Sequence, residues 1–188
     1  MASLAKPKVL VLFYSRTGTT RHLAESIARA LHADLEELRE SRSRSGVLGW
    51  LRCGYDGAHH RSSETLPLQH ELADYDLIVV GSPTWNGALS SPVRGFLERN
   101  RQRLPKVALF ATCARDGSAK VLAEMAELLP SPPVATLGML ENDVKHGPAV
   151  WVGELAEAAL TALESESAQA RGAQRVAGSV IRHHGSQP

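Results

Sequence analysis

Hydroxyl side chains surround a glycine in the segment from Ser15 to Thr20, which reads Ser-Arg-Thr-Gly-Thr-Thr. The hydroxyls of Ser15, Thr17 and Thr20 can each donate a hydrogen bond to a phosphate oxygen. Gly18 allows the tight bend that brings a backbone close to a ligand. These residue types at this spacing predict a site for an anion. The residues alone leave open a second interpretation, a capped helix that binds no ligand.

The flanking segments are those that would hold such a loop in place. Residues 9–14 are an apolar, β-prone run, which predicts a buried parallel strand. From about Thr20 to Leu31 the apolar residues recur at steps of three and four, which predicts a helix with one buried face. The free backbone N–H groups at the start of that helix, together with its dipole, favour a bound anion. The loop has neither the Gly-Lys-Ser/Thr ending of a Walker loop nor the G-x-G-x-x-G spacing.

Strands and helices alternate along the rest of the chain. Further strands are predicted at 32–38, 76–81, 106–111 and 134–140, and helices start near Pro92, Ser118 and Val152. This alternation predicts an α/β three-layer sandwich with a five-stranded parallel sheet of order 2-1-3-4-5. In that order the loops 15–20, 82–91 and 112–118 meet at one edge, because the carboxyl ends of parallel neighbours lie together.

The loop 82–91 carries Trp85 in a polar turn between two prolines. An exposed indole costs free energy unless something covers it, so a flat ligand over the ring is one interpretation. Packing of the ring against the protein interior is the other, and the sequence does not decide between them. Asn86 and Gly87 accept positive φ, which would let a peptide in this loop flip.

The first loop resembles the phosphate loop of the flavodoxin-like family, T/S-x-T-G-x-T, at Ser15, Thr17, Gly18 and Thr20. The resemblance covers roughly residues 8–163 and implies FMN as the cofactor. It implies that Thr84 and Trp85 match the Thr-Trp pair that stacks on the isoalloxazine ring. It departs at 112–118, where many flavodoxins have a Tyr and this loop has no aromatic residue. Arg115 could set a positive field near the flavin N1 or pair with Asp116.

The expected cofactor-binding residues fall in three groups, for the phosphate, one ring face with N5, and the pyrimidine edge. They are Ser15, Arg16, Thr17, Gly18, Thr19 and Thr20; Pro83, Thr84, Trp85, Asn86 and Gly87; and Thr112, Cys113, Ala114 and Gly117. No catalytic side chain and no metal site is expected, and Cys113 is expected to be a small contact rather than a redox thiol.

The chain has 188 residues, a net charge of +1 and two cysteines, Cys53 and Cys113. These values fit one domain in a reducing, cytoplasmic compartment and give no reason to expect nucleic-acid or membrane binding. We expect a flavodoxin-like domain over 1–164, with an inserted basic segment at 39–61, and a helix end with a flexible tail over 165–188. The insert contains a run, 47–51, that predicts a short helical turn, and its arginines fit either a solvated loop or a partner surface.

Two classes of function fit these features. The first is an FMN-binding redox protein, either an electron carrier served by a flavoprotein reductase or other redox protein, or a small FMN-dependent NAD(P)H oxidoreductase of the quinone type. The second is a flavin-free interaction module of the same fold, working through segment 39–61. The sequence leaves open whether the protein is a monomer or a homodimer.

Overall fold

The computed structural model describes residues 6–40 and 62–180. Its sheet has five parallel strands in the order β2-β1-β3-β5-β6, with a short strand, β4, pairing antiparallel to β3. The strands are β1 Val9–Phe13, β2 Asp34–Glu37, β3 Leu77–Trp85, β4 Ala88–Leu89, β5 Lys106–Cys113 and β6 Thr136–Leu140. The five parallel strands confirm the predicted fold class and order, and β4 is an addition that the sequence interpretation lacked.

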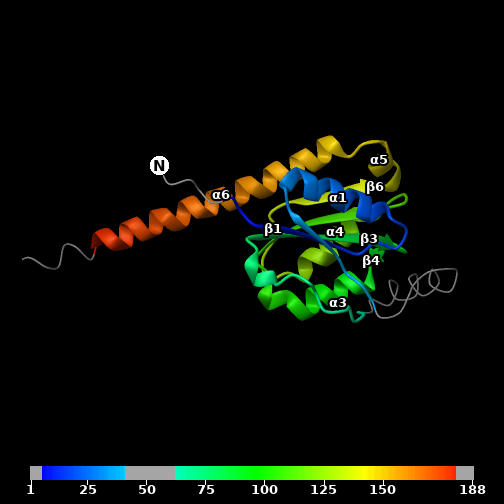
Figure 1. Ribbon diagram of the computed structural model, residues 1–188, viewed down its shortest axis with the longest axis horizontal. Coiled ribbons are helices and arrows are strands. Elements are labelled where there is room, and N and C mark those ends of the chain that lie inside the picture. The colour runs from blue at the N-terminus through cyan, green and yellow to red at the C-terminus, as the bar shows by residue number, and fades with distance from the viewer. Residues whose placement is uncertain (1–5, 41–61, 181–188) are drawn as a thin grey trace, which may run out of the picture.

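Helices cover both faces of the sheet (Figure 1). They are α1 Thr19–Leu31, α3 Ser91–Asn100, α4 Ser118–Glu127, α5 Glu141–His146 and α6 Ala149–Val180, with 3₁₀ turns at Leu72–Asp74 and Arg101–Arg103. Alternate residues of β1 enter different cores, because successive side chains of a strand point to opposite faces. Leu10 and Leu12 pack with α3 and α4, whereas Val9, Val11 and Phe13 pack with α1 and α6.

Gly81 shows how closely the central strands are packed. A Cβ atom at this position would lie 1.9 Å from Cζ of Phe110 on the neighbouring strand β5. Phe110 is fully buried, so its ring occupies the space that a side chain at residue 81 would need. The glycine therefore lets an aromatic ring fill the core between β3 and β5, just below the edge where the predicted loops meet.

The connection from β2 to β3 crosses the sheet without a described helix. We call residues 62–71 the strap. Its Ser63 N–H donates to the carbonyl oxygen of Ser91 at 3.0 Å, and Arg99 donates to the Ser63 carbonyl at 3.1 Å. At the other end, the buried carboxylate of Glu36 accepts from the backbone N–H of Gln69 at 2.7 Å. The predicted insert 39–61 lies mostly outside the described residues, as does its helical turn at 47–51.

Two helices differ from the sequence expectations. The six-residue helix α5, which directly follows β6, was not predicted. Helix α6 was expected to fray from residue 165 but runs to Val180, and its last turns project away from the sheet (Figure 1). Within residues 6–40 and 62–180, no helix has the length and apolar character needed to span a bilayer.

Tyr75 fixes the start of β3 to the edge strand. Its hydroxyl donates to Oδ2 of Asp34 at 2.8 Å. Burial, followed by the hydrogen bond to Asp34 and the nearby carboxylates, raises the pKa of Tyr75 above its ordinary value. This contact lies at the opposite end of the strands from the predicted loops, and we assign it a structural role.

Candidate functional site at the carboxyl edge of the sheet

The three predicted segments do meet at one edge, because β1, β3 and β5 are parallel neighbours. Oγ1 of Thr20, in the first turn of α1, lies 2.8 Å from Oγ1 of Thr112 near the end of β5. A Cβ atom at Gly117 would lie 3.4 Å from Cγ2 of Thr84 and 3.5 Å from Cα of Gly87. The hydrogen bond joins the first segment to the third, and the space around Gly117 shows that the third loop lies beside the second.

The first loop ends in a helix start whose N–H groups have no side-chain cap. Gly18 occupies the N-cap position with φ 99°, and no acidic residue lies in the first turn of α1. Oγ of Ser15 accepts a hydrogen bond from the Gly18 N–H at 3.1 Å, which shapes the loop. Arg16, Thr17 and Gly18 are exposed. A helix start of this kind attracts an anion through its free N–H groups and its dipole.

The second segment is a β-hairpin rather than the open loop that the sequence predicted. β3 continues to Trp85 and pairs with β4, with Thr84 opposite Leu89 and Trp85 opposite Ala88. Asn86 and Gly87 form the two-residue turn, with φ of 51° and 71°. Positive φ at both positions is typical of a type I′ turn, whose twist matches that of the paired strands. The sequence correctly predicted positive φ at Asn86 and Gly87, and in the structure this conformation closes the hairpin.

The structure shows which way the side chain of Trp85 points, a question that the sequence left open. Its side chain is 6% exposed and belongs to the core under α3 and α4. The indole meets Tyr14 edge-on, with ring centroids 5.5 Å apart and an interplanar angle of 86°. Burial of the ring in the core already removes it from water, so no flat ligand is needed to cover it. The ring packs inward in this structure, as one of the two interpretations expected, and stacking of Trp85 on a flavin stays a prediction.

The third segment contributes small residues to the rim. Ala114 and Arg115 are exposed, and Gly117 begins α4 with φ 106°. Cys113 is 3% exposed, and its Sγ lies 3.7 Å from the carbonyl oxygen of Met139 on β6. Its thiol therefore faces a neighbouring strand, and Cys113 itself is paired with Leu140 in the sheet.

These features can be tested for their fit to FMN. Open space surrounds the Cβ positions of Gly18 and Gly87, so backbone at both loops is accessible to a close ligand. In the pair of Thr20 and Thr112, one hydroxyl donates to the other, which leaves one O–H free to donate to a phosphate. Oγ1 of Thr84 is buried beside the third loop with no hydrogen-bond partner in the described part of the chain. An unmet hydrogen bond of this kind is one that a bound polar ligand can relieve. The residues fit a phosphorylated cofactor.

Sequence reasoning missed the polar groups that hold the hairpin. Oγ of Ser82 and Oγ of Ser90 lie 2.9 Å apart, and both side chains are fully buried. Below them Arg94 and Glu124 form an ion pair at 2.7 Å. No sequence spacing marks these pairs, because the partners belong to different elements.

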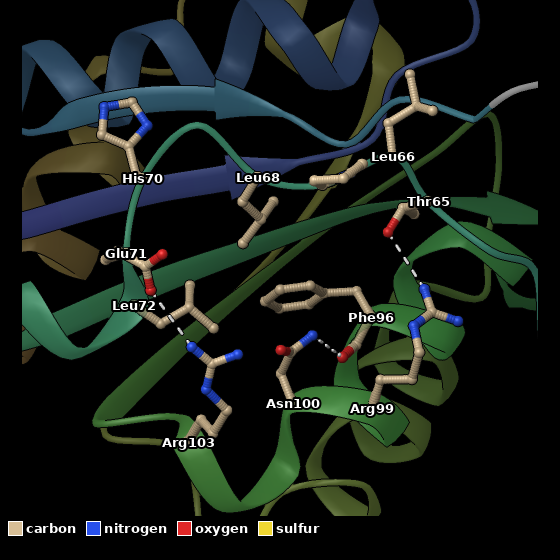
Figure 2. Close-up of a pocket in the computed structure, with 11 residues that line it drawn as sticks. Thr65, Leu66, Leu68, His70, Glu71, Leu72, Phe96, Arg99, Asn100 and Arg103 are labelled. Atoms are coloured by element: carbon tan, nitrogen blue, oxygen red, sulfur yellow. Dashed lines mark hydrogen bonds and ion pairs between the residues drawn. The ribbon is translucent and has the colours of Figure 1, made fainter.

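A separate cavity of about 320 Å³ lies between the strap and α3 (Figure 2). Phe96 and Leu72 line it, and Arg99 and Arg103 extend beside it. Arg99 donates to Oγ1 of Thr65 at 3.2 Å, and Arg103 pairs with Glu71 at 3.4 Å. None of the residues around it comes from the three loops. The cavity therefore does not belong to the candidate site.

Comparison with known proteins agrees with this fold. A family model described as NADPH-dependent FMN reductase matches residues 7–140. An NAD(P)H dehydrogenase (quinone) of Cupriavidus metallidurans is 34% identical over 97 residues, which are 49% of this chain and 46% of the relative. The chain thus matches about half the length of that protein.

Solved structures share the fold. A flavoprotein from Lactobacillus acidophilus, solved in complex with FMN, superposes with a TM-score of 0.62 at 23% identity, covering 74% of this chain and 97% of the other. A WrbA-like flavodoxin from Agrobacterium tumefaciens gives a TM-score of 0.51 at 17% identity, covering 82% of this chain and 98% of the other. At these identities the likeness establishes architecture.

Proposed function

Because the chain belongs to the NADPH-dependent FMN reductase family, we propose that it is an FMN-dependent oxidoreductase that takes electrons from NAD(P)H and passes them to a quinone-type acceptor. The match to this family supports FMN as the cofactor. The observation that carries the proposal is the joining of three loops at one sheet edge, around a helix start with no side-chain cap. The quinone acceptor is favoured by the relative named above.

Each loop has a distinct task in the proposed site. The N–H groups at the start of α1 and the hydroxyls of the first loop hold the phosphate. The tip of the hairpin, Asn86 and Gly87, approaches the ring through its backbone, since the indole of Trp85 is turned inward. Main-chain groups of the third loop line the pyrimidine edge. The full proposed set, in which Trp85 contributes its main chain rather than its ring, is Ser15, Arg16, Thr17, Gly18, Thr19, Thr20, Pro83, Thr84, Trp85, Asn86, Gly87, Thr112, Cys113, Ala114 and Gly117.

Bound FMN would supply the electron transfer between nicotinamide and acceptor, and the protein would bind and orient it. The third loop bears on which substrates can approach. Residues 112–118 contain no aromatic side chain, and Ala114 at its exposed part is small. A ring face left open in this way admits a nicotinamide or a quinone directly. This favours the reductase over the electron carrier, which delivers electrons through a protein partner.

The compartment and partners follow from the proposed activity. A nicotinamide-fed reductase suits the cytoplasm, which agrees with a chain whose two cysteines form no disulfide framework in sequence. Its reaction partners would be small molecules. A flavoprotein reductase would be needed only if the protein works as a carrier.

The experiment is a direct titration of the purified protein with FMN, followed by anaerobic reduction. We expect quenching of flavin fluorescence on binding, and bleaching of the visible flavin band by NADPH or NADH with reoxidation by a soluble quinone. Failure to bind FMN would contradict the proposal and favour a flavin-free module. Binding without reduction by either nicotinamide would leave FMN in place but favour the carrier.

A further inference from the structure

The hairpin that rims the candidate site rests on a buried ion pair. Oε2 of Glu124, in α4, lies 2.7 Å from a terminal guanidinium nitrogen of Arg94, in the first turns of α3. The side chains are 10% and 13% exposed for Arg94 and Glu124. The same carboxylate oxygen accepts the backbone N–H of Leu89, in β4, at 3.2 Å. One carboxylate oxygen thus joins α3, α4 and the hairpin.

We propose that Glu124, held by Arg94, is a positioning residue for FMN: it sets the distance between the β3–β4 hairpin and the third loop, and so the width of the flavin slot. The inference rests on the proposed function and deepens it. Glu124 acts through other groups, because it is buried below the hairpin and contributes no atom to the rim.

The pair of Arg94 and Glu124 lies where it can control the distance between the hairpin and the third loop. Helix α4 begins at Ser118, directly after Gly117, where an added Cβ would come within 3.4 Å of Thr84 and 3.5 Å of Gly87, so the third loop runs beside the hairpin. The Glu124 carboxylate bonds α4 to the hairpin at Leu89. This bond fixes the hairpin relative to the third loop. Without it, the hairpin could tilt against the third loop and change the spacing of the rim.

The charge of Arg94 explains why a carboxylate is needed at residue 124. A buried cation requires a close countercharge, since a low-dielectric surrounding strongly disfavours an uncompensated charge. Glutamine in place of Glu124 could still accept the Leu89 N–H, but it would leave Arg94 without this countercharge. The charge-assisted hydrogen bond between residue 124 and Arg94 would then weaken. Because the same oxygen also accepts the Leu89 N–H, a looser side chain at residue 124 would hold the hairpin less firmly.

The test compares Glu124→Gln with a matched stability control, Val152→Ala. Val152 is 3% exposed on α6, in the core on the opposite face of the sheet. Both variants are expected to lower the melting temperature. Only Glu124→Gln is expected to raise the Kd for FMN, by about tenfold, which corresponds to a loss of about 1.4 kcal/mol of binding free energy. Arg94→Lys keeps the charge opposite Glu124 and is expected to keep most of the affinity.

A second measurement does not depend on FMN. Hydrogen exchange of the Leu89 amide, measured on the apoprotein, should be faster in Glu124→Gln than in wild type and unchanged in Val152→Ala. Equal Kd values for wild type and Glu124→Gln would overturn the inference, as would equal loss of FMN affinity in the two variants. If wild type binds no FMN, the proposed function fails. The Leu89 amide then decides the inference alone, and unchanged exchange in Glu124→Gln would overturn it.

Discussion

At the scale of single residues, the site depends on backbone conformations that only some residues tolerate. Gly18, Gly87 and Gly117 all have positive φ, and each lies in a different segment of the rim. Asn86 shares this conformation as a non-glycine residue, for which asparagine is the residue best suited. The chemistry of the rim is therefore largely that of main-chain N–H groups, placed by turns.

Gly18 offers a test of the phosphate loop with a natural control elsewhere in the chain. Gly18 and Gly147 both have positive φ, and a Cβ at either meets no atom within 4 Å. Alanine at either position should therefore cost about 1 kcal/mol of stability through backbone strain alone. Only Gly18→Ala should also weaken FMN binding, because it lies at the start of α1. Titration of both variants checks this, and equal FMN affinity in the two would contradict the role of the loop.

Trp85 provides a second test at this scale. Since its ring fills the core, Trp85→Ala should destabilise the protein by about 3–5 kcal/mol. Trp85→Phe keeps an aromatic ring in contact with Tyr14 and should lose less stability, while its Kd for FMN stays within about threefold of wild type. Chemical denaturation and FMN titration give the two quantities. A large loss of FMN affinity in Trp85→Phe at near-native stability would restore the stacking role.

At the scale of elements, the sheet edge is assembled by contacts between strands and helices that are distant in sequence. Thr20 and Thr112 connect α1 to β5, and Glu124 connects α4 to β4. Packing below the edge determines how far the strands lie apart, and therefore where the loops begin. Among the described glycines, an added Cβ would come nearest to another atom at Gly81, against the ring of Phe110.

A substitution at Gly81 should act through that ring. Gly81→Ala places a methyl group where Phe110 lies, and overpacking of this kind costs about 1–3 kcal/mol. The double variant Gly81→Ala with Phe110→Leu should recover part of the loss, because the smaller side chain vacates the contested space. Unfolding free energies of both single variants and the double variant form a complete cycle. Additive effects in that cycle would rule out the steric explanation.

At the scale of the whole molecule, the core and the site occupy residues up to about 163. Among the α6 residues whose side chains are described, Val152, Leu155, Ala156 and Ala159 are buried, and Leu163 packs partly against this core. Beyond that point the helix projects from the body (Figure 1). We therefore keep the expectation that residues 1–164 form the FMN-binding domain.

Truncation tests that boundary. A chain ending at Glu164 should keep its unfolding free energy within about 0.5 kcal/mol of the full chain, because the core residues described on α6 all precede residue 164. Its Kd for FMN should be unchanged. Thermal unfolding and FMN titration of the two chains give the comparison. A truncated chain that unfolds or loses FMN would show that residues 165–188 belong to the domain.

The sequence by itself determined the order of the strands and the edge at which the loops meet. Hydrophobic periodicity reports which segments are buried, and the chain order of strands and helices permits few topologies. The first loop could also be proposed from the sequence, because the anion site proposed there consists of consecutive residues, Ser15 to Thr20.

Three features became visible only in the folded structure. They are the inward orientation of Trp85, the hairpin formed by β3 and β4, and the buried ion pair of Arg94 and Glu124. Each of these depends on partners remote in the chain. Tyr14 receives the indole, Leu89 pairs with Thr84, and α4 brings Glu124 to α3. Local sequence patterns do not predict such partners, because the free energy that favours these contacts arises only when the elements pack together.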